Sequence, residues 1–317
     1  MCVTGCYGKE LFRSKQKTLL LQKKLKLSQT VAHLFLFLVA LIYGANYTIA
    51  KEVLDNDYIS PGAFIVLRIA FAVVLFFIFE RSIATKKVEK KDWGRLVLSG
   101  LFGSAANMLL FFYGLKHTTP IHAALIMTTT PILVLVIALF LRKEVISVKK
   151  IIGIILGMTG AIMTIMAGKS LDFAQATTNG DLMVFLNAAS YAIYLIIVKD
   201  LLDKYHPLTV LKWVFFFGLI FVLPVGAPEL PEIAWGSFPT SIWLATGYVL
   251  LFTTFFTYFL NVSALRVIPA STVSFYIYLQ PILATIIAVF LGKDQFDLQD
   301  VLLLSMIFLG VYLVSKK

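Results

Sequence analysis

Long, nearly unbroken runs of apolar residues divide the chain, and short polar segments separate them. A membrane-spanning helix needs about 20 mostly apolar residues. Strands of a membrane barrel alternate apolar and polar positions, which these runs do not. The pattern therefore predicts an all-α membrane protein with ten transmembrane helices. They are expected near 31–51, 61–80, 95–115, 119–141, 149–167, 181–199, 209–226, 240–265, 268–292 and 298–315.

The composition agrees with a membrane protein and excludes several other classes. Hydrophobic residues make up 59% of the 317 residues and charged residues 14%, whereas soluble domains average about 45–50% and about 25%. A soluble enzyme, a disordered chain and a disulfide scaffold are thereby excluded. The two cysteines, Cys2 and Cys6, both lie in the N-terminal tail and cannot complete a four-ligand zinc site. No metal and no cofactor are expected.

The placement of basic residues predicts the orientation in the membrane. With a cytoplasmic N-terminus, 21 of the 28 Lys and Arg residues fall on the cytoplasmic side and 4 in outer loops. Such a bias follows the positive-inside rule. It predicts that both termini are cytoplasmic, in a multi-pass protein of the cell (inner) membrane, and that residues 1–30 are a basic cytoplasmic tail. The net charge of +11 is thus explained by topology, and no nucleic-acid partner is expected.

Two segments of the chain resemble each other when the sequence is shifted by 150 residues. Residues 115–143 align without gaps with 265–293, and Pro131 then matches Pro281. A weaker match with a shift of 148 pairs Tyr43 with Tyr191 and Lys51 with Lys199. The chain is therefore expected to contain two related units, at 31–168 and 181–315.

Each unit holds five of the predicted spans, and five is an odd number. The second unit must then enter the membrane from the opposite side, which makes an inverted repeat. Two similar halves that face opposite ways can exchange conformations. The substrate site of such carriers lies between the halves, near the bilayer midplane.

Several motifs in this chain are similar to those of a known family, the EamA-type carriers of the drug/metabolite transporter superfamily. The matching features are Tyr43-Gly44-Ala45-Asn46-Tyr47 before Lys51, Pro61 before Arg68, Pro131 with Glu144 after its helix, and the small residues Gly153, Gly157 and Gly160. The chain departs from the family at Lys143 and at Asp294. The resemblance covers about residues 31–315. It implies a ten-helix carrier that exports or exchanges small metabolites, such as amino acids.

Polar side chains inside the apolar runs are the candidates for a substrate cavity. Tyrosine and asparagine recur at spacings of three and four on the first and sixth spans, which places each set along one helix face. Such a wall suits a neutral or zwitterionic metabolite, and helix-to-helix bonding is the alternative role. The candidates are Tyr43, Asn46, Arg68, Asn187, Tyr191, Tyr194, Tyr276 and Gln280.

Charge inside the predicted spans is confined to very few positions. All 17 acidic residues lie in loops or at helix ends, whereas proton-coupled export of cations relies on a buried carboxylate. Neutral, zwitterionic or anionic solutes are therefore expected instead. Arg68 lies two turns into the second span, where it could bind a substrate carboxylate or tie helices together through backbone carbonyls.

Pro131 and Pro281 occupy matching positions in the fourth and ninth spans. Proline removes a hydrogen bond of the helix and bends it. In matching positions of both halves, the two prolines are candidate hinges. The threonines before Pro131 could instead bond back to their own helix.

The sequence as a whole predicts a secondary active transporter, not an enzyme, that moves a small metabolite across the plasma membrane by alternating access. The alternatives are a membrane-embedded lipid-handling protein or enzyme, and a solute channel. The expected partners are the small-molecule metabolite and the lipid bilayer. A monomer and a homodimer are both compatible with the sequence.

Overall fold

The computed structural model describes residues 27–54, 58–83, 85–118, 120–141, 147–166, 178–233, 235–290 and 298–315. Most of the basic tail with its two cysteines, residues 55–57, Glu144 and Asp294 lie outside the described residues. Within these ranges all regular secondary structure is helical. The prediction of an all-α protein is therefore confirmed for the described part of the chain.

The helices follow the apolar runs closely. The first half comprises α2 (Gln29–Leu54), α3 (Pro61–Arg81), η1 (Lys90–Asp92), α4 (Trp93–Gly100), the π-helical turn η2 (Leu101–Ala105), α5 (Ala106–Lys116), α6 (Pro120–Met127), α7 (Thr130–Phe140) and α8 (Val148–Met166). The second half comprises α9 (Thr178–Leu202), α10 (Pro207–Gly226), η3 (Ala227–Glu232), η4 (Trp235–Ser237), α11 (Thr240–Tyr248), the π-helical turn η5 (Val249–Phe256), α12 (Thr257–Leu265), α13 (Ala270–Phe275), the 3-10 turn η6 (Tyr276–Tyr278), α14 (Leu279–Phe290) and α15 (Leu298–Ser315).

Seven stretches of the described chain are long and apolar enough to cross a membrane, judged by length and composition. They coincide with the first four predicted spans and with the sixth, seventh and eighth. The fifth, ninth and tenth spans, predicted at 149–167, 268–292 and 298–315, stay predictions, although helices α8, α13, α14 and α15 occupy those positions.

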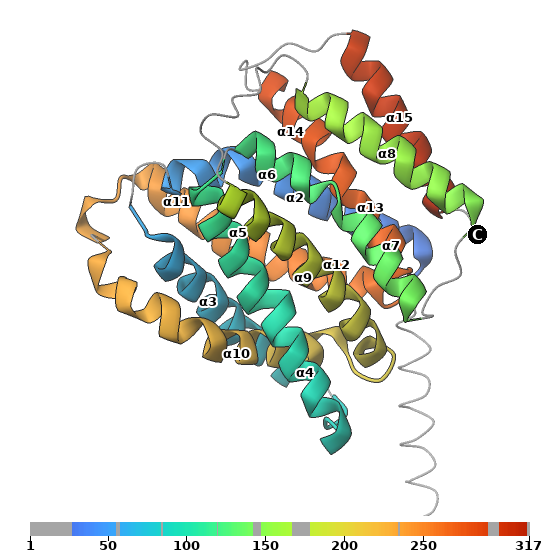
Figure 1. Ribbon diagram of the computed structural model, residues 1–317. Helices are drawn as coiled ribbons and strands as arrows, with labels where there is room; N and C mark the ends of the chain where they lie inside the picture. The colour runs from blue at the N-terminus through green and yellow to red at the C-terminus, as the bar shows by residue number, and fades with distance from the viewer. Residues whose placement is uncertain are drawn as a thin grey trace, which may run out of the picture.

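Corresponding helices of the two halves pack against each other. Helix α3 runs along α10, and α8 runs along α15. These two pairs lie at opposite edges of the bundle (Figure 1). Between them, α2 contacts α12 and α14 of the second half, and α9 contacts α5 and α7 of the first half. The contacts are thus reciprocal, as in an isologous interface between two copies of one unit.

The α8–α15 contact depends on two glycines that face each other. A Cβ atom added at Gly310 would lie 2.7 Å from the carbonyl oxygen of Gly153, and one at Gly153 would lie 2.9 Å from the carbonyl oxygen of Gly310. Small residues allow such close backbone approach and are typical of membrane helix pairs. Of the small residues predicted on the fifth span, Gly153 and Gly160 therefore face α15, whereas an added Cβ at Gly157 would meet Phe275 and Tyr278.

We expect Gly310→Ala to destabilise the protein, because backbone cannot yield to the added methyl group. Overpacking of this kind costs about 1–3 kcal/mol. The midpoint of thermal unfolding in one detergent would measure it. Gly247→Ala in α11 is the matched control, because nothing lies within 4 Å of a Cβ there. Equal midpoints for the two variants would show that the helices do not approach each other so closely.

Irregular turns interrupt the helices at corresponding places in both halves. The third span contains η2 and the eighth contains η5, both π-helical. The fourth span breaks at Thr128–Thr129, between α6 and α7, and the ninth changes to 3-10 geometry in η6. Both breaks lie just before a proline, Pro131 or Pro281, that cannot donate a helix hydrogen bond. Each proline therefore lies in the first turn of the helix that follows the break, α7 or α14, where its missing N–H group removes no hydrogen bond of that helix.

Candidate functional site

A cavity of about 570 Å³ lies between the two halves of the bundle. Its volume is in the range of small-molecule sites, about 300–1,000 Å³. Helices α2, α3, α5 and α6 of the first half line it together with α9, α12, α13 and α14 of the second. Seven of the eight candidates predicted from the sequence are among its lining residues, namely Tyr43, Asn46, Arg68, Asn187, Tyr191, Tyr276 and Gln280.

The eighth candidate and the two prolines are not among the cavity-lining residues. Tyr194 is 1% exposed, and its ring fills the space beside Gly103, where an added Cβ would lie 2.2 Å from the ring. Sequence periodicity placed Tyr194 on the same helix face as Tyr191, but packing against the glycine turns it into the protein core. Pro131 and Pro281 stay outside the lining as well.

Arg68 is held in the cavity wall by one hydrogen bond and by two aromatic rings. It is 5% exposed, and its Nε donates a hydrogen bond of 3.0 Å to Oγ1 of Thr254. Its guanidinium carbon lies 5.1 Å from the ring centre of Phe112 and 5.8 Å from that of Phe64. Aromatic faces attract a cation. The described contacts of Arg68 are thus with side chains, whereas the helix-tying alternative required backbone carbonyls.

The hydroxyl groups of two corresponding tyrosines are each hydrogen-bonded to a side chain of α12. The Asn261 amide donates to the Tyr191 hydroxyl at 2.5 Å, which leaves the Tyr191 O–H group available as a donor. The Tyr43 and Thr257 hydroxyls lie 3.3 Å apart, and because Thr257 gives its own proton to the carbonyl oxygen of Thr253, the Tyr43 hydroxyl donates to Thr257. The two related helices α2 and α9 therefore each bring a tyrosine to the cavity lining from opposite halves.

The π-helical turns provide bonding groups that a regular helix would not. Backbone carbonyls released in η2 accept hydrogen bonds across the bundle, Phe102 from Ser190 at 2.8 Å and Gly103 from Tyr258 at 2.9 Å. In η5, the Thr254 hydroxyl donates a hydrogen bond to the carbonyl oxygen of Val249, five residues earlier, and accepts one from Nε of Arg68. Released carbonyls within a membrane need such partners, and π turns are frequent at functional sites.

The two broken helices meet at their breaks. The Tyr278 hydroxyl in η6 donates to the carbonyl oxygen of Thr128 at 3.1 Å, and these two residues match in the 150-residue shift. The hydroxyls of Thr128 and Thr129 bond back to their own helix, at 2.6 and 2.7 Å. These two threonines therefore take the role that the sequence offered as the alternative, which is a hydrogen bond back to their own helix.

The cavity carries positive and no negative side chains among its lining residues. Arg68 and Lys116 line it, and no aspartate or glutamate does. Ile59, Pro61, Lys116 and Thr118 mark the end of the bundle that the cavity reaches, which we call the Lys116 end. Among the described residues, no group of three His, Cys, Asp or Glu side chains could hold a metal ion.

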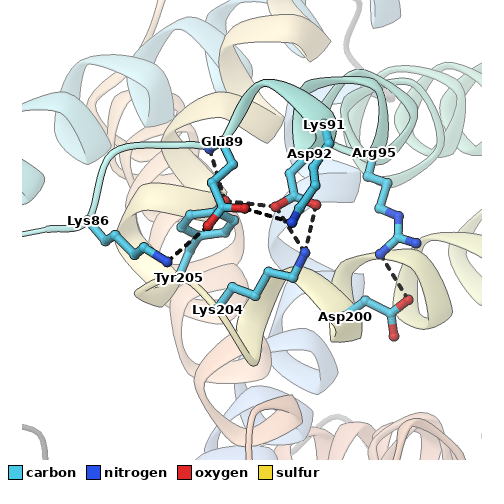
Figure 2. A network of polar contacts seen from close by, with 8 residues as sticks. All are labelled: Lys86, Glu89, Lys91, Asp92, Arg95, Asp200, Lys204 and Tyr205. Carbon is cyan, nitrogen blue, oxygen red and sulfur yellow. Dashed lines mark hydrogen bonds and ion pairs between the residues drawn. The ribbon is translucent and has the colours of Figure 1, made fainter.

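A polar network joins the two halves at the opposite end, which we call the Asp92 end (Figure 2). Asp92 is 2% exposed and accepts two hydrogen bonds from Lys204, at 2.9 and 3.0 Å, and one from the Tyr205 hydroxyl at 2.8 Å. Arg95 pairs with Asp200 at 3.4 Å. The loop before α4 is thereby fastened to the end of α9, and no residue of this network lines the cavity.

The outer part of this network is an exposed ion-pair cluster around Glu89. Its carboxylate contacts Lys91 at 2.9 Å and Lys86 at 3.0 Å, and these contacts lower the pKa of Glu89. The backbone N–H of Glu89 donates to the Tyr205 hydroxyl at 3.0 Å, and burial raises the pKa of that tyrosine. Exposed ion pairs of this kind contribute little stability. The hydrogen bonds of the buried Asp92 with Lys204 and Tyr205 therefore form the main link between the two halves at this end.

Two further links close the Asp92 end. The Lys199 ammonium group on α9 donates to the backbone carbonyl oxygens of Leu265 and, at 3.0 Å, Ile268, which border the turn between α12 and α13. On the α3–α10 side, Lys212 pairs with Glu80 at 3.0 Å. Charged hydrogen bonds to partly buried groups are among the stronger polar contacts in proteins.

Sequence reasoning missed several residues of the site. Thr254, Phe112 and Tyr258 carry no signal of their own in the sequence, because a threonine or an aromatic residue in an apolar run is typical of ordinary packing. The ion pair of Lys212 with Glu80 and the buried Asp92 were also missed. One signal does exist for Lys199, because it matches Lys51 when the sequence is shifted by 148 residues.

Comparisons with known proteins agree with this architecture. The EamA-like transporter family matches residues 30–166 and again residues 178–316. YyaM of Bacillus subtilis (strain 168), called an uncharacterized transporter, is 26% identical over 256 residues, which cover 78% of this chain and 82% of YyaM. An uncharacterized transporter of Archaeoglobus fulgidus is 26% identical over 284 residues, which cover 89% of this chain and 98% of that protein.

A solved structure supports the fold independently. A crystal structure of another protein superposes with a TM-score of 0.72, covering 91% of this chain and 97% of that chain, at 17% sequence identity. The apolar helices, the family match and the transporter relatives together define a multi-pass membrane transport protein. Because the family matches both halves, the chain belongs to the EamA-like transporter family.

Proposed function

We propose that this transporter is a secondary carrier that moves a small metabolite, such as an amino acid, across the plasma membrane by alternating access. The observation that carries the proposal is the cavity between the two halves, which reaches the Lys116 end while the polar network fastens the Asp92 end. A carrier needs a site that is open to one side at a time. A channel would need a path through both ends.

The reciprocal packing of the halves supports the same mechanism. Helices α3 and α10 correspond to each other, as do α8 and α15, and each pair packs together. Two equivalent halves can exchange their arrangements, so that the other end opens. In this proposal all ten helical segments cross the membrane as two inverted five-helix repeats. Both termini are cytoplasmic, and the Lys116 end faces outward.

The breaks before Pro131 and Pro281 are the proposed hinges. The Tyr278–Thr128 hydrogen bond joins them between the halves. A helix that is already interrupted needs to break fewer hydrogen bonds when one of its parts rotates. The substrate would contact the proposed cavity residues of both halves, which are Tyr43, Asn46, Arg68, Asn187, Tyr191, Tyr276 and Gln280.

Counterflow in proteoliposomes tests the proposal. Liposomes with the purified protein are loaded with a cell-extract metabolite pool and diluted, and mass spectrometry follows the uptake of a labelled copy of the same pool. A carrier is expected to accumulate labelled solutes of one chemical class above the level in protein-free liposomes. The accumulation should saturate with external concentration.

Two outcomes would contradict the proposal. Flux that never saturates and shows no counterflow indicates a channel. The absence of counterflow for every solute, with protein folded and present in both orientations, indicates a lipid-handling role instead.

A further inference from the structure

The guanidinium group of Arg68 is a buried cation whose charge is not neutralised by a side chain of the described residues. Its only hydrogen bond to that part of the chain is from Nε to Thr254, and its terminal nitrogens donate none. The rings of Phe64 and Phe112 attract the cation. However, they accept no directed hydrogen bond from the guanidinium edge, so the two terminal nitrogens remain available to a ligand.

The acids at the two ends of α3 do not supply the missing negative charge. Glu80 is bound by Lys212 and Thr209, at 3.0 and 3.2 Å. Glu229 accepts from the Tyr113 hydroxyl at 2.7 Å and from the backbone N–H of Ala63 at 3.2 Å. Neither acid lines the cavity. An unpaired buried charge is costly, and chains retain one where a ligand neutralises it.

The surroundings of Arg68 favour a planar oxyanion. Guanidinium presents parallel N–H groups that match the two oxygens of a carboxylate. Tyr191 also lines the cavity, and its hydroxyl, which accepts from Asn261, can donate its own proton to an anion. Lys116 lines the cavity where it reaches the bundle end, so an anion meets positive charge along the way.

The remaining wall would hold the rest of the substrate. Apolar side chains of both halves line it, including Met108, Met127, Val273 and Ile277. Methionine adapts its shape to different partners. A small molecule with one carboxylate and a compact apolar or aromatic remainder fits these surfaces.

We propose that Arg68 is the anchor for a carboxylate of the transported solute, and that the substrates are small carboxylic or amino acids rather than organic cations. This inference rests on the proposed transport function. Arg68 contacts the carboxylate through its two terminal nitrogens, while Thr254 and the two phenylalanine rings fix the orientation of the guanidinium plane.

Matched ligand pools test the inference with purified full-length protein. One pool holds the common L-amino acids and short monocarboxylic acids, and the other holds their carboxamides. Thermal stabilisation by each pool is measured for the wild type and for Arg68→Gln, Arg68→Lys and Lys87→Gln. Lys87 is an exposed loop lysine that does not line the cavity, so its variant controls for the loss of one positive charge.

The expected result is stabilisation of the wild type and of Lys87→Gln by the carboxylate pool only. Arg68→Gln should weaken apparent binding at least about tenfold, because a charge-assisted paired hydrogen bond is lost. Arg68→Lys should retain part of it. If Arg68→Gln has a much lower unfolding midpoint without ligand, Arg68→Lys carries the comparison, because it keeps the charge and loses only the paired geometry.

The outcomes separate this inference from the transport proposal. Counterflow of solutes without a carboxylate, or equal stabilisation by carboxamides, would overturn the role of Arg68 while leaving a carrier. Undiminished carboxylate binding by both Arg68 variants would also overturn the role of Arg68 and leave the carrier function in place. A wild type that shows no counterflow for any solute would overturn the transport function and this inference together.

Discussion

Cross-linking of positions 95 and 200 is expected to stop transport completely. Arg95 and Asp200 pair across the two halves at the Asp92 end, at 3.4 Å, and both are accessible to reagents. The native cysteines are only Cys2 and Cys6, so Cys2→Ser and Cys6→Ser give a background without thiols. A short thiol-reactive cross-linker applied to Arg95→Cys with Asp200→Cys would then join the first turn of α4 to the last turn of α9.

Alternating access requires this end to open, and a covalent bridge prevents it. Counterflow should disappear on cross-linking and return when a cleavable linker is reduced. Each single-cysteine variant with the same reagent controls for labelling. The pair Lys87→Cys with Lys90→Cys, within one loop of the first half, controls for the bridge itself. Undiminished counterflow in fully cross-linked protein would mean that this end stays closed during transport.

The sequence predicted the helical segments and the repeat more completely than it predicted the site. Apolar runs of about 20 residues mark helices in a membrane whatever their neighbours are, and the matching of Pro131 with Pro281 survives in the sequence itself. The π-helical turns η2 and η5 left no comparable signal. They arise from packing between helices, for example where Tyr258 reaches the Gly103 carbonyl.

Residue spacing along a helix indicates a cavity-lining residue correctly where the helix face alone determines it. It fails where contacts with other helices determine the position of the side chain. Tyr43 and Tyr191 lie on the faces that spacing indicates, and both line the cavity. Tyr194 shares that spacing but packs against Gly103 instead. Arg68 was visible as an isolated charge, whereas its partner Thr254 belongs to a π turn in the other half. Long-range pairing of this kind cannot be read from one helix at a time.

The link between Lys199 and the turn after α12 has a counterpart in the sequence of the first half. Lys199 binds the carbonyl oxygens of Leu265 and Ile268 at the Asp92 end. Lys51 matches Lys199 in the 148-residue shift, and Leu115 and Thr118 match the two carbonyl positions in the 150-residue shift. In the opposite conformation, we expect Lys51 to bind the carbonyl oxygens of Leu115 and Thr118 and to close the Lys116 end.

This symmetry predicts opposite effects for two chemically identical substitutions. Lys199→Gln removes a link that exists only when the Asp92 end is closed, so it should shift the population toward opening at that end. Lys51→Gln should shift the population the other way. A charged hydrogen bond contributes about 1.5–3 kcal/mol, which corresponds to a shift of about tenfold or more in the equilibrium between the two conformations.

Labelling of a cavity cysteine measures that equilibrium. Ala124→Cys, in the background without native thiols, places the thiol in the cavity wall on α6. An impermeant maleimide added on the side of the Lys116 end should react more slowly with the Lys199→Gln variant and faster with the Lys51→Gln variant. Lys87→Gln should leave the rate unchanged. Changes in the same direction for both lysine variants would refute the exchange of equivalent links, because a loss of stability alone does not reverse sign between the two halves.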